Sequence, residues 1–269
     1  MPELAVSSWS LHRELGPMYW DPKAPDQTWG EGRLTLLDAP AVVAEMGVPN
    51  LEVCHFHFPR TDPEYLAELR ARLDDAGVRF LTLLIDTGDL TASDSDARQR
   101  DMEIIRGWIE VAAQAGAAQV RVIAGDAEPD ADGVALQRSI AGLGELAAYA
   151  DSLGVRVITE NWHQLTMRPE HLLTVLNALH GTVGLCADFG NYKGSTKYDD
   201  LRAILPRANT IHAKADFPEP GVLDLEDFGR CLELARTAGF DGQYVLIFDS
   251  PGEEVPSLRQ IAAEVTPYL

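Results

Sequence analysis

Four segments of this chain share one local pattern: a helix-forming stretch ends on glycine, and an apolar residue then leads into a β-branched, apolar run. The four pairs are Gly77-Val78, Gly116-Ala117, Gly154-Val155 and Gly239-Phe240. Glycine adopts the left-handed conformation that ends many helices, and the apolar residue after it starts a buried strand. Repetition of this unit predicts helices that alternate with parallel strands.

The rest of the chain extends the alternation. Short apolar runs predict strands at residues 4–8, 50–53, 79–84, 119–123, 156–160, 183–187, 210–214 and 244–248. Amphipathic segments predict helices at residues 36–46, 63–76, 93–115, 133–153, 169–179, 201–205, 225–238 and 255–265. Eight such units favour an α/β fold, a single-domain (β/α)8 TIM barrel over residues 1–269. A doubly wound open sheet is the alternative, but Ser8-Trp9-Ser10 contains no glycine-rich dinucleotide-binding turn.

Charge and cysteine content argue against several classes of function. The chain has 42 acidic and 22 basic residues and a formal net charge of −20, which disfavours nucleic acid and anionic membranes as partners. No apolar run approaches a membrane span, and the first residues lack a signal-peptide pattern. Cys54, Cys186 and Cys231 match neither a zinc motif nor a disulfide framework. We therefore expect reduced thiols and a cytoplasmic protein.

Three successive strand candidates carry a potential metal ligand. Glu160 ends the fifth, Asp188 directly follows the sixth, and His212 lies in the seventh. Because the carboxyl ends of all barrel strands open onto one mouth, we expect these side chains to converge. Two carboxylates and one imidazole suit a single divalent ion of manganese, magnesium, cobalt or zinc, and leave positions open for water or substrate oxygens.

Two further residues are candidates for contact with a substrate. His57 is expected in the loop after the second strand, either near the substrate or at the surface. A zinc pair with His55 is disfavoured, because the adjacent strands supply no further histidine or cysteine for it. Lys214 lies two residues after His212 on the same strand face, where it could bind a substrate oxygen or phosphate.

The order and spacing of four motifs resemble the sugar-phosphate isomerase/epimerase family with xylose-isomerase-like barrels. The motifs are Glu160-Asn161, Asp188-Phe189-Gly190-Asn191, His212-Ala213-Lys214 and Gly239-Phe240-Asp241-Gly242. The resemblance covers nearly the whole chain, and the family includes ketose 3-epimerases, hydroxypyruvate isomerase and inosose dehydratase. It implies one divalent metal ion at the barrel mouth, with Glu160, Asp188 and His212 as three of its four ligands.

The chain departs from the family where the resemblance implies the fourth ligand. Family members have a glutamate there, five residues after the second glycine of the Gly-Phe-Asp-Gly turn, and this chain has Ile247. In the family's epimerases that glutamate is also one of two acid/base carboxylates, so Glu160 remains as the base. Asp249 faces the same way as Ile247, and could replace the lost carboxylate only through a shift of the strand or a bridging water. A solvated loop position is the alternative for Asp249.

The resemblance also implies substrate contacts around the mouth. Trp9 and His12 follow the first strand, where relatives place an aromatic wall and a polar contact. Core packing is the alternative for Trp9. Asn191 falls where several epimerases carry a histidine that contacts the substrate, and this second departure weakens the transfer of any particular substrate.

Three functions compete. The first is a metal-dependent isomerase or epimerase that acts on a small sugar or keto-polyol, with Glu160 as catalytic base; dehydration is a further one-base reaction in this class. The second is a non-catalytic sugar-binding relative with an impaired metal site, motivated by Ile247. The third is a DNA-repair endonuclease, disfavoured by the net charge of −20. We expect a small sugar-like substrate, and the oligomeric state stays open, with a homo-oligomer among the alternatives.

Overall fold

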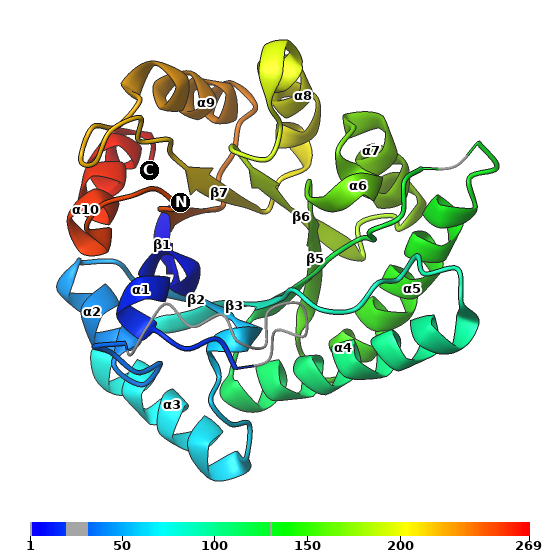
Figure 1. Cartoon of the computed structure of the whole chain (residues 1–269), viewed down its shortest axis with the longest axis horizontal. Coiled ribbons are helices and arrows are strands. Elements are labelled where there is room, and N and C mark those ends of the chain that lie inside the picture. The colour runs from blue at the N-terminus through cyan, green and yellow to red at the C-terminus, as the bar shows by residue number, and fades with distance from the viewer. Residues whose placement is uncertain (1, 20–31, 130) are drawn as a thin grey trace.

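The computed structural model of the chain describes residues 2–19, 32–129 and 131–269. Eight parallel strands follow one another in sequence order around a closed barrel, and the first strand pairs with both the second and the last. Helices surround the barrel between successive strands (Figure 1). The TIM barrel expected from the alternation of elements is confirmed, and the open doubly wound sheet is excluded because the barrel closes.

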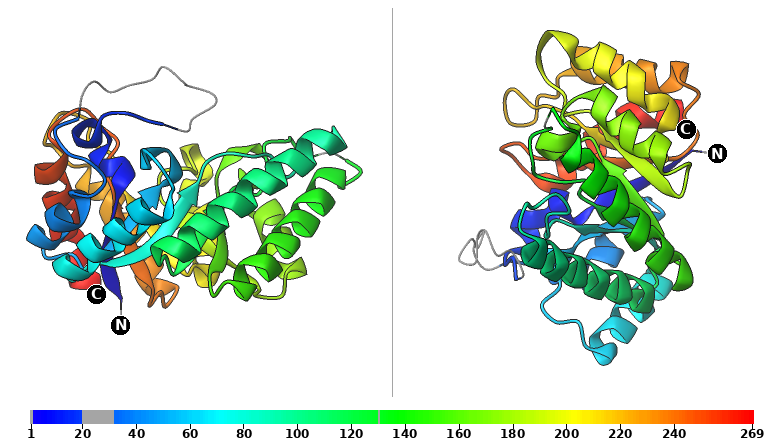
Figure 2. Two further views of the ribbon diagram at one scale, coloured as in Figure 1. Left: turned by 90° about the horizontal axis from the view of Figure 1, so that it is seen from below. Right: turned by 90° about the vertical axis from the view of Figure 1, so that its right-hand side faces the viewer.

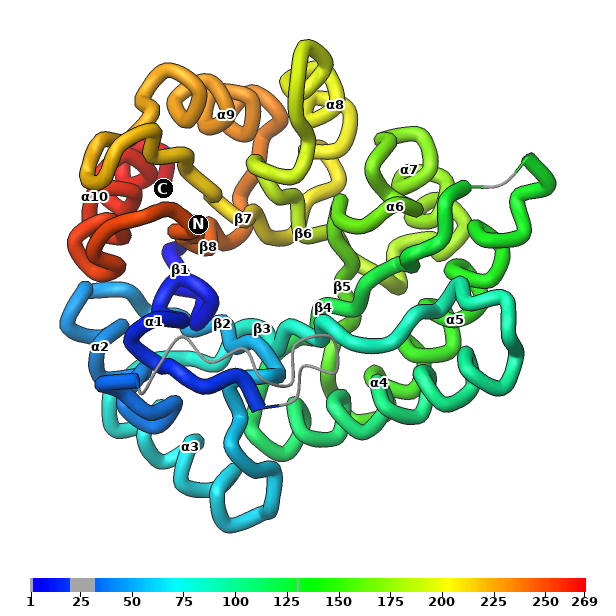
Figure 3. Tube along the Cα trace, in the orientation of Figure 1, coloured from blue at the N-terminus to red at the C-terminus, as the bar shows by residue number. Residues whose placement is uncertain are grey.

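No strand boundary differs from its expected position by more than one residue. The strands are β1 (Glu3–Ser7), β2 (Asn50–Cys54), β3 (Arg79–Ile85), β4 (Gln119–Val122), β5 (Arg156–Glu160), β6 (Val183–Asp188), β7 (Thr210–Lys214) and β8 (Gln243–Ile247). The tube in Figure 3 shows the chain passing around the ring in this order.

The helices agree less closely with the expected ranges. They are α1 (His12–Leu15), α2 (Ala39–Glu45), α3 (Pro63–Ala76), α4 (Ser95–Ala115), α5 (Val134–Ser152), α6 (His163–Thr166), α7 (Pro169–Ala178), α8 (Lys197–Ile204), α9 (Leu225–Thr237) and α10 (Glu254–Val265). The short helices α1 and α6 were not expected. Helix α8 starts four residues early, since Lys197 and Tyr198 bond to Asp227 of α9, a tertiary contact that gives no apolar periodicity.

Local chemistry explains where several helices begin and end. Asp62 accepts a hydrogen bond from the backbone N–H of Tyr65, and Pro63 is the first residue of α3. The four glycines of the repeated pattern all have positive φ, between 67° and 82°. Gly77, for example, ends α3 and donates its N–H to the carbonyls of Leu73 and Asp74. The predicted "helix, glycine, apolar residue, strand" unit is therefore confirmed.

Apolar clusters lie on both sides of the barrel wall. The larger core lies between the barrel and its helices, and the side views show strands crossing the middle of the molecule with helices outside (Figure 2). A smaller cluster of Ala5, Leu81, Val245 and Ile247 packs under Trp9. Cys54, Cys186 and Cys231 are free and buried. No helix in the described part of the chain is both long and apolar enough to cross a membrane.

Candidate active site

A pocket of about 460 Å³ opens at the carboxyl ends of the strands. Every one of the eight strands, or the turn that directly follows it, contributes at least one lining residue. Most of the apolar lining side chains come from the β1–β3 side, among them Trp9, Cys54, Phe56 and Leu84. Most ionisable side chains come from the strands that follow. The mouth is therefore the place where residues far apart in sequence meet, as expected for this barrel.

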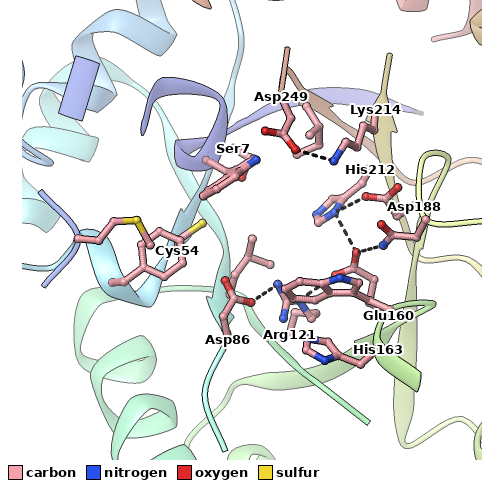
Figure 4. A pocket seen from close by; sticks show the side chains of 17 residues that line it. Ser7, Cys54, Asp86, Arg121, Glu160, His163, Asp188, His212, Lys214 and Asp249 are labelled. Carbon is pink, nitrogen blue, oxygen red and sulfur yellow. Dashed lines mark hydrogen bonds and ion pairs between the residues drawn. The ribbon is translucent and has the colours of Figure 1, made fainter. Parts of the chain in front are cut away.

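Glu160, Asp188 and His212 converge in this pocket (Figure 4). The Nδ1 atom of His212 lies 3.5 Å from Oε1 of Glu160 and 3.5 Å from Oδ2 of Asp188. The strand register explains why these side chains are close. Asp188 of β6 pairs with His212 of β7. Glu160 of β5 pairs with Cys186, which lies two residues before Asp188 on β6 and therefore faces the same way. We call Nδ1 of His212, Oε1 of Glu160 and Oδ2 of Asp188 the inner atoms.

The other polar atom of each of these side chains is bound by a neighbour. Nε2 of His212 lies 3.0 Å from Oε1 of Glu52. Oε2 of Glu160 lies 3.0 Å from Nε of Arg121. Oδ1 of Asp188 accepts the backbone N–H of Gly190. These contacts direct the inner atoms toward one another.

The close neighbours of Asp188 and His212 shift the pKa values of these two groups. Burial raises the pKa of Asp188, but the hydrogen bond and charge of His212 outweigh it and leave the pKa below its usual value. Burial lowers the pKa of His212, yet Cys186, Glu52 and Glu160 bring it well above its usual value. The site thus favours a cation next to its carboxylates.

The residues present fit one divalent ion. Metal–ligand bonds of about 2.0–2.2 Å place neighbouring ligand atoms roughly 3.0–3.5 Å apart, close to the 3.5 Å that separates Nδ1 of His212 from Oε1 of Glu160 and from Oδ2 of Asp188. Glu160, Cys186 and His212 also offer ligand atoms within 4.8 Å of one another. Burial raises the pKa of the Cys186 thiol, which opposes the thiolate that a metal requires. Asp188 is therefore the better third donor.

Ile247 takes the place on β8 where the resemblance implied a fourth ligand. Its side chain lines the pocket, is 4% exposed, and packs with the apolar cluster beneath Trp9. Asp249 also lines the pocket, but its Oδ2 accepts a hydrogen bond of 2.8 Å from Nζ of Lys214. Asp249 is thus held by Lys214 rather than by the inner atoms.

The remaining expected contact residues divide into two groups. Trp9, Asn191, Lys214 and Asp249 line the pocket, and Asn191 donates a 2.9 Å hydrogen bond to Oε1 of Glu160. His12 and His57 are not among the lining residues. His12 is buried, stacks on Trp9 and contacts the Trp9 carbonyl through Nδ1. His57 is buried beside Ser8, whose Oγ lies 2.8 Å from Nδ1.

Sequence reasoning gave no role to Glu52 or Asp86. Asp86 follows β3 and forms an ion pair with Nη2 of Arg121. The signal that identified Glu160, an apolar strand ending on a carboxylate, is also present at Leu84-Ile85-Asp86. For Glu52 the signal is a glutamate within the otherwise uncharged strand β2. Arg121 of β4 connects Asp86 and Glu160.

Comparison with known proteins identifies the class. The family model described as "Xylose isomerase-like TIM barrel" matches residues 40–264, and the chain belongs to that family. No curated protein matches the chain.

Three solved structures share the fold across nearly the whole chain. An L-ribulose 3-epimerase is 15% identical, with a TM-score of 0.74 and coverage of 100% of this chain and 95% of its own. A xylose isomerase-like protein of Mycobacterium smegmatis in complex with magnesium is 16% identical, with a TM-score of 0.70 and coverage of 100% and 98%. A probable 3-DHS dehydratase of Bacillus anthracis is 12% identical, with a TM-score of 0.71 and coverage of 97% and 98%.

Proposed function

We propose that the protein is a metal-dependent isomerase or epimerase-type enzyme that removes a proton next to the carbonyl of a small sugar or keto-polyol. The observation that carries this proposal is the convergence of the inner atoms in a pocket at the barrel mouth. The epimerase and dehydratase that share the fold support the reaction class, and the magnesium complex supports a divalent ion.

Glu160, Asp188 and His212 would hold the ion, of manganese, magnesium, cobalt or zinc, through their inner atoms. When bound, such an ion polarises a carbonyl group and stabilises the negative charge that develops on its oxygen. Ile247 offers no ligand atom, so these three residues leave coordination positions open to water or substrate.

Glu160 is the proposed base. Arg121 contacts its Oε2 and Asn191 donates to its Oε1, so the carboxylate has one fixed orientation beside the pocket. A base must lie within hydrogen-bond reach of the proton it removes, and a fixed carboxylate meets that condition without reorganisation. Trp9, Asn191, Lys214 and Asp249 are the proposed substrate contacts, while His12 acts indirectly by stacking on Trp9.

One-base chemistry suits this pocket better than epimerisation. Inverting a carbon centre requires a second acid/base group on the opposite face of the substrate. The β8 position that the resemblance assigns to this group holds an alkyl side chain, Ile247. Isomerisation or dehydration, with Glu160 as the base, is therefore the favoured reaction.

Ile247 also motivates the second candidate function, a binding protein for a sugar-like ligand without catalysis. The two candidates differ in one observable, because only an enzyme of the proposed class exchanges the proton next to the substrate carbonyl with solvent.

The test incubates the protein and Mn²⁺ with a panel of ketoses and inososes in heavy water. Deuterium is expected at the carbon beside the carbonyl, detected by NMR. Glu160→Gln should reduce exchange by about 10²–10⁴-fold, since the amide cannot accept the proton. Glu254→Gln is the control, because it makes the same change at a buried glutamate that does not line the pocket.

Manganese affinity is measured on the same variants, so that loss of a base is separated from loss of a ligand. Exchange by Glu160→Gln at the parent's rate would refute the assignment of the base. Absence of exchange in the unmutated protein, with tight binding of a panel sugar, would instead establish the binding protein.

A further inference from the structure

Glu52 is a fully buried carboxylate inside the barrel. Glu52 is 0% exposed and lies in β2 between the apolar residues Leu51 and Val53. Alternate residues of a strand share a face, and Cys54 lines the pocket, so Glu52 points into the barrel. A charged group is rarely placed there unless a partner compensates for the loss of water.

The partner of Glu52 is His212. Oε1 of Glu52 lies 3.0 Å from Nε2 of His212, which reaches it from β7. The second oxygen, Oε2, has no hydrogen-bond partner within residues 2–19, 32–129 and 131–269. Ser7 is the register partner of Glu52 on β1, and its buried hydroxyl is also without a partner in those ranges. The hydrogen bond of Glu52 therefore goes to a residue of the site.

The hydrogen bond with Glu52 determines whether Nδ1, on the opposite side of the His212 ring, carries a hydrogen or a lone pair. A neutral imidazole has one donor nitrogen and one acceptor nitrogen. A cation binds the neutral imidazole, and because a carboxylate accepts, Glu52 selects the neutral form in which Nε2 carries the hydrogen and Nδ1 presents its lone pair. Nδ1 is the atom that lies 3.5 Å from both Glu160 and Asp188. The ring is held between Glu52 and these two carboxylates.

We propose that Glu52 is a positioning residue that fixes the orientation and tautomer of His212 so that Nδ1 binds a divalent cation together with Glu160 and Asp188. The inference rests on the metal site of the proposed function. It gives that site a fourth essential residue, which contacts the ligand histidine instead of the ion.

The test measures Mn²⁺ affinity by isothermal titration calorimetry for the full chain and two variants. Glu52→Gln keeps the shape and an acceptor oxygen but loses the charge, so the dissociation constant should rise several-fold. Glu52→Leu removes the acceptor, and the dissociation constant should rise by about 10–100-fold. The graded order of parent, Gln and Leu is the expected result.

Glu254→Gln is the matched control. Glu254 is also a buried glutamate, but it accepts the backbone N–H groups of Arg13 and Glu14 and does not line the pocket. Its variant should bind Mn²⁺ like the parent. Thermal unfolding of each metal-free variant shows how much of any effect is a general loss of stability, and Glu52→Gln keeps the experiment decisive if Glu52→Leu does not fold.

Affinities of both Glu52 variants within about twofold of the parent would overturn the inference, even if the variants unfold at lower temperature, since a purely structural role changes stability without changing affinity. Failure of the parent itself to bind Mn²⁺, Mg²⁺, Co²⁺ or Zn²⁺ would overturn the metal site of the proposed function and this inference with it. The two failures are distinguishable because the second is seen without any mutation.

Discussion

Arg121 explains how the buried carboxylate of Glu160 is tolerated at the mouth. Its guanidinium lies 2.5 Å from Oδ1 of Asp86 and 3.0 Å from Oε2 of Glu160. Burial lowers the pKa of Arg121, but the charges of Asp86 and Glu160 outweigh burial and raise it. A buried carboxylate that loses its partner typically costs about 3–5 kcal/mol. Arg121 thus compensates for the burial of the proposed base and holds its carboxylate in one orientation.

His57 illustrates the opposite solution, a buried group that stays neutral. Burial, with smaller contributions from His12 and His55, lowers the pKa of His57 to about 3. Between about pH 6.5 and pH 3 the unfolded chain binds a proton at this residue and the folded chain does not. Stability should therefore fall as pH decreases through this window, by about 1.4 kcal/mol per pH unit from this residue.

The prediction is tested with His57→Gln, which has no titrating group and can still bond to the Ser8 hydroxyl. Urea unfolding at about pH 6, 5 and 4 should show a less steep loss of stability in the variant, by roughly 1 kcal/mol per pH unit. Since the many carboxylates titrate alike in both proteins, they cancel in the difference. Parallel pH profiles would show that His57 is protonated in the folded chain.

Residues close in sequence determine where most of the strands and helices begin and end. The helix-ending glycines and the apolar runs placed every strand to within one residue of its observed bounds. The elements that were missed, α1 and α6, have only four residues each. Such short helices contain too few turns to show an apolar period, and their position depends on contacts with the barrel.

Strand β8 offers a way to restore a carboxylate to the site. Ile247 is the register partner of Lys214 and faces the pocket. In Ile247→Glu, a new carboxylate lies among the existing acids, so the metal-free protein should be less stable than the parent. With Mn²⁺ the added negative ligand should lower the dissociation constant by about tenfold. Calorimetric titration and thermal unfolding measure the two effects.

Ile247→Gln controls for the loss of the alkyl side chain, because it is polar and of similar length to glutamate but uncharged. It should not tighten Mn²⁺ binding as the glutamate does. Equal affinity of the glutamate variant and the parent would mean that residue 247 lies out of reach of the ion.

The whole molecule combines a closed barrel with a strongly acidic surface charge. The formal net charge is −20. The proposed metal site places two of the carboxylates close to one imidazole in the pocket. An ion that binds the folded chain and not the unfolded chain stabilises the fold by mass action. Binding of a divalent ion should therefore be visible in global stability.

Adding Mn²⁺ to about 100 times its dissociation constant should stabilise the protein by about 2.7 kcal/mol. For a chain of this size that corresponds to a rise in Tm of roughly 5–10 °C. Differential scanning calorimetry at constant ionic strength, adjusted with NaCl, separates specific binding from screening of the net charge. Asp188→Asn is the control, and an equal rise in Tm for that variant would place the ion elsewhere on the acidic surface.

The sequence by itself determined the barrel, because glycine at helix ends and buried apolar runs act within a few residues of chain. It also supplied Glu160, Asp188 and His212, since each stands at or near the end of a strand whose direction is fixed by the parallel topology. Only the tertiary structure decided what surrounds them. Glu52 and Arg121 reach the site from β2 and β4, and Lys214 holds Asp249. Closure of the barrel brings these residues together across up to 160 positions of sequence, a distance over which local patterns carry no information.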